Sequence, residues 1–403
     1  MPVLQVLRWA LLAAEVWIAV PILYLCILSV SAILTAKKRN SEAISPSSQA
    51  NFVILIPAHN EEAILGNLLG SLSKLAYPKD LYTVFVVADN CTDNTAELVR
   101  ATGWVRVYER FDENKRGKGH ALSWLLHELE MNRLIYDAYI IIDADSMVVP
   151  TFLQAMNREL AEGAQALQAC NTVLNISESP STALRLVALT LVNHVRTLGR
   201  NGLGASSTLT GNGMCLSRSL LMRYPWRAFA IAEDYQYYLT LVQHGERVRY
   251  VPEAVVRSHM PISFARMRTQ DVRWESSELG QPTWRIALNL FGAGLRLRNF
   301  VCLEAIAELL TPPLSFLVCW CLLILLASLL MWSPPELLFS LLLFGGLACY
   351  IGTGLYLLRP PRIVYKAFLY APGFMAWKLW IYFILRRNKK HTSEWIRTSR
   401  TSS

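Results

Sequence analysis

An uninterrupted apolar run near the start of the chain limits what this sequence can fold into more than any other feature. Residues 9–36 carry a single charge, Glu15, and exceed the ~20 apolar residues with which a helix crosses a bilayer. The basic cluster Lys37, Lys38 and Arg39 follows this run, whereas a cleaved signal peptide has its positive charges in front. We therefore predict a retained transmembrane helix whose downstream end faces the cytoplasm.

Three further apolar stretches lie near the C-terminal end, approximately at residues 310–332, 336–358 and 363–385. Proline-bearing breaks separate them, and the first two predict a helical hairpin. The third contains Lys366 and Lys378 and precedes a basic tail, so it either crosses the membrane or lies at its interface. The positive-inside rule favours the interface, with the tail in the cytoplasm.

Composition agrees with a chain that lies partly in lipid, since 53% hydrophobic residues is too high for a purely soluble protein. The net charge of +9 suits phosphates or anionic lipid, but many solvated surfaces carry as much. The eight cysteines include no pair at zinc-finger or redox spacing, which indicates reduced thiols. We predict an integral protein of the plasma (inner) membrane with a cytoplasmic domain. No nucleic-acid partner is expected, because the basic residues cluster beside the apolar spans.

Between about residues 50 and 280, short β-branched runs alternate with helical patterns, which indicates an α/β sheet. The expected strands are residues 52–56, 83–87, 105–108 and 139–142. The expected helices between them are residues 61–75, 94–101, 120–129 and 151–161. The predicted divisions of the chain are residues 1–45 (helix and linker), 46–265 (cytoplasmic domain), 266–303 (interfacial helices) and 304–403 (transmembrane helices and basic tail).

Polar residues follow these strands where an open parallel sheet binds its ligand, beyond the carboxyl ends. Those after the first two strands, Pro57, Ala58, His59, Glu61 and Asp89, are candidates for a ligand-binding crevice. The carboxylate after the second strand could accept hydrogen bonds from a nucleobase or ribose. The alternative is a local Asx-turn with the following asparagine.

Two carboxylates, Asp143 and Asp145, follow the fourth strand. Residues two apart on an extended strand end point to the same side, so both can face one ligand. Mg²⁺ or Mn²⁺ prefers such oxygen ligands and often needs only one or two carboxylates. A solvated turn is the alternative. Lys118, beside glycines at a helix start, could hold a phosphate, or it could belong to a plain surface turn.

Two later segments carry further candidates. Glu233 and Asp234 could supply a base that takes a proton from a hydroxyl, or they could be the acidic first turn of a helix. Gln270, Arg273 and Trp274 share one helix face through their i, i+3, i+4 spacing. The arginine could neutralise a diphosphate and the indole could stack on a sugar ring. The alternative is an amphipathic helix with a buried Trp at the membrane surface.

Taken in order, the segments PAHNE, ADNCTD, DAD, TLTGNGM, AED and QDVRW resemble the membrane-integrated family 2 glycosyltransferases of the GT-A fold. That group contains cellulose, chitin, hyaluronan and poly-N-acetylglucosamine synthases, and the resemblance covers nearly the whole chain. It implies an α/β GT-A domain combined with transmembrane and interfacial α-helices. Ala232, where processive members often have Thr, and the differing segment at residues 208–213 argue against cellulose synthase itself.

The same resemblance implies the roles of individual residues. Asp89 would bind the nucleobase, and Asp143 and Asp145 would bind the diphosphate-bound Mg²⁺ or Mn²⁺. His259 matches a further metal ligand of many GT-A enzymes, although a lone His near an apolar strand is more often structural. Asp234 would be the base. Gln270, Arg273 and Trp274 would form the family's helix motif. Glu233, next to the base in the sequence, could orient either the base or the metal site.

Three hypotheses follow for the activity. The first is inverting transfer of a sugar from a UDP-sugar to a growing β-linked polysaccharide, with export proteins as further partners. The second is transfer of one sugar to a membrane lipid. The third is a catalytically silent membrane scaffold, which the retention of the four key aspartates disfavours.

Overall fold

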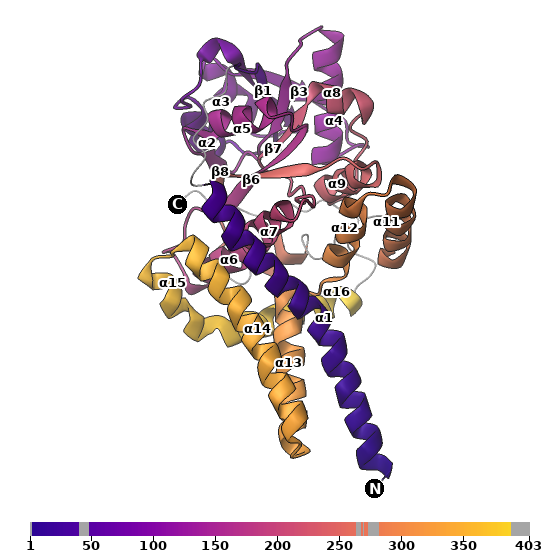
Figure 1. Ribbon diagram of the computed structural model, residues 1–403. Helices are drawn as coiled ribbons and strands as arrows, with labels where there is room; N and C mark the ends of the chain where they lie inside the picture. Colours follow the sequence, from indigo (N-terminus) through magenta and orange to yellow (C-terminus); the bar gives the residue numbers. More distant parts are fainter. Residues whose placement is uncertain (1, 40–47, 263–266, 269, 273–281, 388–403) are drawn as a thin grey trace.

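The structure is a computed structural model that describes residues 2–39, 48–262, 267–268, 270–272 and 282–387. An α/β domain built on one sheet lies above a group of long helices (Figure 1). Helix α1 (Pro2–Arg39) runs from the far end of this helical group up to the sheet. The two parts correspond to the hydropathy pattern of the sequence.

Within the described residues the sheet has eight strands in the order β3-β2-β1-β4-β7-β6-β8-β5. Its parallel half consists of β1 (Phe52–Ala58), β2 (Tyr82–Asp89), β3 (Arg106–Arg110) and β4 (Ala138–Ile141). Its mixed half consists of β5 (Ser146–Val148), β6 (Ala166–Val173), β7 (Met214–Ser217) and β8 (Val248–Ser258). Strand β7 is antiparallel to both β4 and β6, so the two halves meet there.

The central strands are apolar on both faces because helices cover both faces. In β1, Ile54 belongs to one buried cluster and Leu55 to the other. The first cluster includes side chains of α2 (Leu65–Leu72), α3 (Thr95–Ala101) and α5 (Phe152–Ala161). The second includes side chains of α4 (Lys118–Met131), α8 (Arg218–Arg223) and α9 (Glu233–Gln243). The sheet is thus the middle layer of three, which leaves its strand ends to carry a site.

The four predicted strands and the four helices between them are confirmed, with ends that differ by a few residues. The prediction that Asp143 and Asp145 lie on an extended strand end is wrong. Strand β4 ends at Ile141, and the amide of Ser146 donates to the Asp143 carbonyl at 3.2 Å, which closes a turn. The chain turns here because β5 pairs with β8 on the far side of the sheet.

The helical part contains two helices in the described chain that are long and apolar enough to cross a membrane, namely α1 and α14 (Pro334–Leu358). A third crossing results if α12 (Phe300–Leu310) and α13 (Leu314–Leu330), bent by 61°, form one broken span. Helices α13 and α14 form the predicted hairpin beside α1 (Figure 1). Helix α11 (Thr283–Leu297) packs antiparallel beside α12, and both contact α9.

A helical segment beneath the sheet connects the long apolar helices to the α/β domain. It consists of α6 (Pro180–Thr190), the π-helical turn η2 (Leu191–Arg196) and α7 (Thr197–Gly202). Helix α7 approaches α1 so closely that a Cβ on Gly199 would lie 2.3 Å from the Leu28 carbonyl oxygen. A glycine is therefore required where the two backbones meet.

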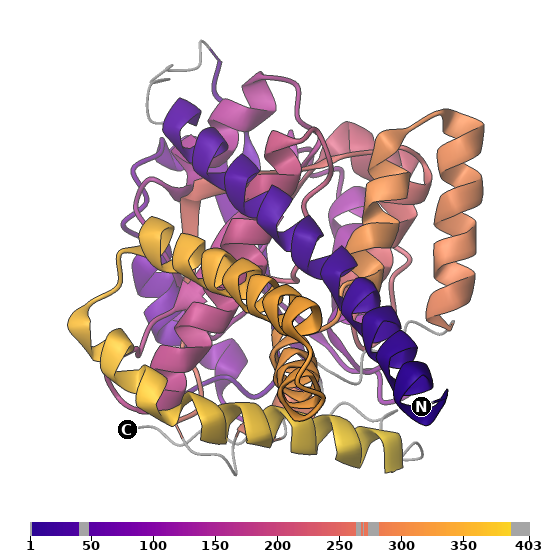
Figure 2. The same cartoon turned by 60° about the horizontal axis from the view of Figure 1, so that its bottom comes forward.

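The third apolar stretch of the C-terminal region is broken into α15 (Arg362–Ala367), the 3₁₀ turn η3 (Phe368–Tyr370) and α16 (Ala371–Arg387). Figure 2 shows α16 running across the bottom of the view, whereas α14 runs obliquely toward the viewer and α13 is strongly foreshortened. An orientation across the hairpin is the one expected for an interfacial helix rather than for a crossing.

Candidate functional site

The carboxyl ends of β1 and β2 are bonded to each other. Pro57 and Ala58 pair with Val87 and Ala88 in the parallel ladder. Immediately beyond, the imidazole Nδ1 of His59 lies 2.7 Å from the carbonyl oxygen of Asp89. The predicted crevice residues after these two strands therefore lie together.

The loop after β1 is also fastened to the loop after β2. The side-chain oxygen of Asn60 accepts a hydrogen bond from the amide of Thr92 at 2.7 Å, and the amide of Glu61 donates to the Thr95 hydroxyl at 2.9 Å. Asn60 adopts a left-handed backbone conformation (φ 56°), which asparagine tolerates better than most residues. Glu61, a predicted crevice residue, is held at this edge through its backbone.

Asp89 forms a buried ion pair that was not predicted. The guanidinium Nη1 of Arg110, at the end of β3, donates to Asp89 Oδ1 at 2.5 Å, and the Asn90 amide donates to the same oxygen at 3.0 Å. Burial raises the pKa of Asp89, against the opposing effect of Arg110. Within the described part of the chain both side-chain bonds fall on Oδ1. Arg110 was missed because its alignment with Asp89 follows from the β2–β3 register.

Lys118 lies at the centre of an acidic cluster formed by Asp143, Glu233 and Asp234. Its Nζ donates to Asp143 Oδ1 at 2.6 Å and to the Gly211 carbonyl at 2.5 Å, and it lies 3.5 Å from Glu233 Oε1. These neighbours outweigh burial and raise the pKa of Lys118. The lysine predicted to hold a phosphate thus brings three distant segments together: its own, that of Asp143 and that of Glu233 and Asp234.

The two carboxylates of the third segment begin helix α9, so the acidic first turn and the acidic cluster are the same feature. Burial raises the pKa of Glu233 to about 7, and the nearby Lys118 opposes this rise. Burial likewise raises the pKa of Asp234, again against Lys118 and with a contribution from Asp143. A Cβ on Gly211 would lie 2.9 Å from Asp234 Oδ2, so a glycine lets this carboxylate approach the loop.

Asn212 positions the turn that carries Asp143 and Asp145. Its side-chain oxygen accepts the Asp143 amide at 3.1 Å, and its amide nitrogen donates to the hydroxyls of Ser146 at 2.8 Å and Ser258 at 3.1 Å. Asn212 therefore links β4, β5 and β8 at one point. The sequence segment TLTGNGM was noted as a motif, but nothing in it indicated this role.

The donors around this turn fit a hard divalent cation. Asp143 and Asp145 are partly exposed, while Ala144 between them is buried, so solvent reaches both aspartates. The β5–β8 ladder pairs Ser146 with Ser258, which places Asp145 and His259 one residue beyond its end. Among the described residues, no group of three or more His, Cys, Asp or Glu side chains is arranged to hold a metal ion without other ligands. Sites of Mg²⁺ and Mn²⁺ commonly complete their shell with phosphate oxygens and water instead.

His259 has a second neighbour. Its Nε2 lies 3.5 Å from Glu178 Oε1, and its side chain is more than half exposed. The predicted metal-ligand role of His259 therefore competes with this contact, and it stays a prediction.

The QDVRW segment is only partly described. Gln270 is buried, and its side-chain oxygen accepts from Arg185 Nη1 at 3.3 Å. The adjacent Asp271 is fully buried and accepts from Arg185 at 2.8 Å, from Lys378 at 3.0 Å and from the Trp377 indole at 3.2 Å. The predicted residues Arg273 and Trp274 lie outside the described residues.

The family model described as "Glycosyltransferase like family 2" matches residues 49–277, more than half of the chain. The chain belongs to glycosyltransferase family 2. The predicted glycosyltransferase class is thereby confirmed. Membership of an enzyme family argues against the hypothesis of a catalytically silent membrane scaffold.

The relatives of this family 2 chain have names that indicate different products. It is 26% identical to the probable glycosyltransferase YdaM of Bacillus subtilis, over 55% of this chain and 53% of YdaM. It is 31% identical to the beta-monoglucosyldiacylglycerol synthase of Nostoc, over 42% and 36% of the two chains. A probable glucomannan 4-beta-mannosyltransferase of Arabidopsis thaliana is 25% identical over 59% and 46%. The chain spans about half or less of the length of these relatives.

Among solved structures, the mannosyltransferase PcManGT of Pyrobaculum calidifontis, described in complex with GDP-Man and Mn²⁺, matches with a TM-score of 0.58. The match covers 96% of this chain and all of PcManGT at 17% sequence identity. At that identity the match shows the fold. The predicted GT-A fold is thereby confirmed for this family 2 chain.

Proposed function

We propose that the chain transfers a hexosyl group from a UDP-sugar to an acceptor hydroxyl at the cytoplasmic face of the plasma membrane, with inversion at the anomeric carbon. The observation that carries this proposal is the convergence of Asp143, Glu233 and Asp234 on Lys118 at the carboxyl edge of the sheet. An inverting displacement needs a base on the face of the sugar opposite the leaving diphosphate and a cation at that diphosphate, and the carboxylates of this cluster could serve as the base and as a cation ligand.

Asp234 is the proposed base. Burial raises its pKa, which brings a carboxylate closer to the neutral range in which a general base works best. Glu233 orients Asp234. Lys118 stays protonated and holds the carboxylates together by charge and hydrogen bonding. The proton of the acceptor hydroxyl passes to Asp234 as the acceptor oxygen bonds to the anomeric carbon, and the bond to the diphosphate breaks.

The donor would lie along the carboxyl ends of β2, β1 and β4. Its nucleoside is proposed to lie against Asp89 and the Pro57-Ala58-His59-Glu61 edge. Asp143 and Asp145 would hold a Mg²⁺ or Mn²⁺ ion, with His259 as a further ligand. Such an ion neutralises the charge that develops on the leaving diphosphate. Arg273 and Trp274 keep their proposed roles beside the diphosphate and the acceptor.

A membrane lipid is the acceptor that the surroundings of the site favour. An open, mainly apolar groove of about 580 Å³ is lined by Gly373, Ala376, Trp377 and Trp380 of α16. The indole of Trp377 is bonded to Asp271, so this groove adjoins the residue next to Gln270, one of the predicted acceptor residues. The Arg268 guanidinium lies 5.5 Å from the Trp380 ring centre and adds a positive charge suited to an anionic headgroup.

A growing polysaccharide is the second candidate acceptor, as the sequence first suggested, and the resemblance to the Arabidopsis glucomannan enzyme supports it. Sizing the product separates the two. Purified protein in nanodiscs is incubated with Mn²⁺ and radiolabelled UDP-Glc, UDP-GlcNAc, UDP-Gal, UDP-GlcA or GDP-Man. A single-sugar lipid supports the first candidate and a polymer supports the second.

Replacing the proposed base tests the function itself. We expect Asp234→Asn to lower kcat by at least about 100-fold, because an amide cannot take the proton. Binding of UDP, measured by calorimetry, should survive. Asp80→Asn, an exposed aspartate in the 3₁₀ turn η1 (Lys79–Leu81) before β2, is the matched control and should keep wild-type turnover. Wild-type turnover by Asp234→Asn would remove this residue from the mechanism.

A further inference from the structure

A buried arginine joins the helix that carries the proposed base to the membrane-proximal helices. Arg200, in α7, is completely buried, and its guanidinium makes four hydrogen bonds. Nη1 donates to the Thr208 hydroxyl at 2.9 Å, and Nη2 donates to the Tyr238 hydroxyl at 2.9 Å. Nε and Nη2 donate to the two carboxylate oxygens of Glu304 at 2.7 and 2.9 Å. The planar guanidinium therefore donates hydrogen bonds to three residues at once.

Two of these bonds, to Thr208 and Tyr238, reach segments that contribute to the acidic cluster around Lys118. Tyr238 follows Asp234 by four residues on α9, so both side chains lie on the same face of the helix. Thr208 precedes Gly211 by three residues, and the Gly211 carbonyl accepts from Lys118. Arg200 is thus bonded to the helix that carries Asp234 and to the loop against which Asp234 packs.

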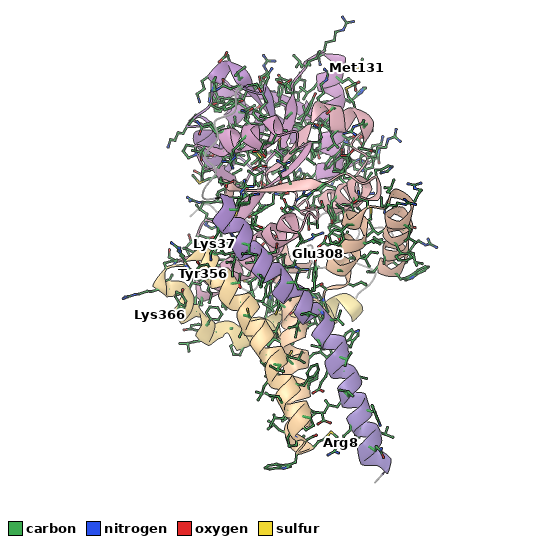
Figure 3. The ribbon with its side chains drawn as sticks, in the orientation of Figure 1. Arg8, Lys37, Met131, Glu308, Tyr356 and Lys366 are labelled. Carbon is green, nitrogen blue, oxygen red and sulfur yellow. The ribbon has the colours of Figure 1, made fainter. Side chains whose placement is uncertain are left out.

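The remaining bonds reach the membrane side. Glu304 belongs to α12, and its Oε1 also accepts from the hydroxyl of Tyr24 in α1 at 2.5 Å. One turn further along α12, Glu308 pairs with Arg196 of the π-helical turn at 2.7 Å. Glu308 lies where the α/β domain meets the spans (Figure 3). π-Helical turns are rare and are frequent at functional sites.

The charges in this network balance, since Arg196 and Arg200 face Glu304 and Glu308. A lysine would keep the charge at position 200 but would lack the fork that reaches three partners at once. We infer that Arg200 is a positioning residue that fixes α9 and the loop of residues 208–212 relative to the membrane helices α1 and α12, and so sets the place of Asp234. This inference rests on the proposed function.

Deleting single hydroxyl groups tests the inference better than replacing the arginine, because loss of Arg200 would leave Glu304 buried without its partner. Tyr238→Phe removes the contact with α9, and Thr208→Val removes the contact with the loop. Tyr237→Phe is the matched control. Tyr237 is the adjacent residue of α9 and is equally buried, but its hydroxyl donates to the Tyr224 carbonyl at 2.7 Å and not to this network.

We expect Tyr238→Phe and Thr208→Val each to lower kcat by about three- to tenfold, the equivalent of one hydrogen bond, with the donor KM unchanged. Tyr237→Phe should keep wild-type kcat at a similar loss of thermal stability. Equal effects on kcat in the two tyrosine variants, or none in either, would overturn the inference while the wild type still transfers sugar. An inactive wild type would instead reject the proposed function.

Hydrogen exchange provides a readout that does not depend on activity. Tyr238→Phe should speed amide exchange at residues 233–237, and Thr208→Val at residues 208–212, by about three- to tenfold, since each segment loses its bond to Arg200. In Tyr237→Phe the loop of residues 208–212 should exchange at the wild-type rate. Unchanged exchange of that loop in Thr208→Val would contradict the positioning role, whether or not a substrate is known.

Discussion

Lys118 is the positively charged residue at the centre of the proposed site. The glycines around it suggested a phosphate-binding turn. In the structure its Nζ meets Asp143, Glu233 and the Gly211 carbonyl instead. Gly119 permits this placement, because a Cβ there would lie 2.2 Å from the Ala228 carbonyl oxygen. Lys118 therefore lowers the pKa values of Glu233 and Asp234, and its contact with the donor's phosphate stays a prediction.

Removing that charge should change the pH dependence of transfer. Lys118 lowers the pKa of Glu233 and of Asp234, so Lys118→Met should raise both. A base must be deprotonated to act, and the acid limb of the kcat/KM profile should therefore move to higher pH. The pH profile of Lys115→Met, which removes an exposed positive charge nearby, is the comparison and should keep the wild-type limb. A lower maximal kcat/KM in Lys118→Met, with its acid limb at the wild-type pH, would contradict this electrostatic role.

The candidate residues differ in how far sequence alone could place them. Asp89 and Asp143 could be placed near one another, because both follow strands of a parallel sheet and the carboxyl ends of such strands meet at one edge. Arg110, Asn212 and Arg200 could not. Their partners depend on strand register or on contacts between segments many residues apart, and no local pattern encodes those contacts.

At the scale of elements, the predictable parts are those with a strong local period. Strands β1, β2 and β4 are continuous apolar runs, and α1 and α14 are long enough to identify by hydropathy alone. The mixed half of the sheet was not predicted. Strand β5 has three residues, and β8 contains a proline and a register shift opposite β6, so neither shows a regular alternation.

Helix α16 was ambiguous from sequence because it contains Lys378. In the structure this lysine and Trp377 donate to the fully buried Asp271. Lys378→Met should destabilise the protein by about 1–3 kcal/mol, as expected when a buried carboxylate loses a charged partner. The thermal midpoint in detergent should fall by several degrees. Lys366→Met, on the exposed face of α15, is the control. Equal midpoints in the two variants would mean that α16 is not fastened through Asp271.

At the scale of the whole molecule, α1 and the α/β domain are held together at the end of the helix. Arg39 Nη2 bonds to Glu159 of α5 at 2.6 Å and to Glu253 of β8 at 2.8 Å. Glu159 also pairs with Arg249 at 3.0 Å. The basic end of α1 was read from sequence as a signal of orientation only. Its acidic partners lie 120 and 214 residues away and could not be foreseen.

The arrangement of the spans makes a prediction about the sides of the membrane. Arg8 and Lys37 lie at opposite ends of α1, and Lys37 is at the end beside the sheet (Figure 3). The hairpin of α13 and α14 turns at Trp332, which is 90% exposed at the end remote from the sheet, as expected for an aromatic anchor in the opposite interface. The chain therefore returns to the side of the α/β domain before α15 and α16 begin.

Two epitope tags tested separately in sealed right-side-out vesicles check this topology. A tag after Ser403 should be protected from protease, because the basic residues after α16 favour the cytoplasmic side. A tag inserted between Trp332 and Ser333 should be cleaved. Both accessibilities should reverse in inside-out vesicles. Cleavage of the C-terminal tag in right-side-out vesicles would mean that α16 crosses the membrane, which would remove its groove from the cytoplasmic site and with it the proposed entry of a lipid acceptor.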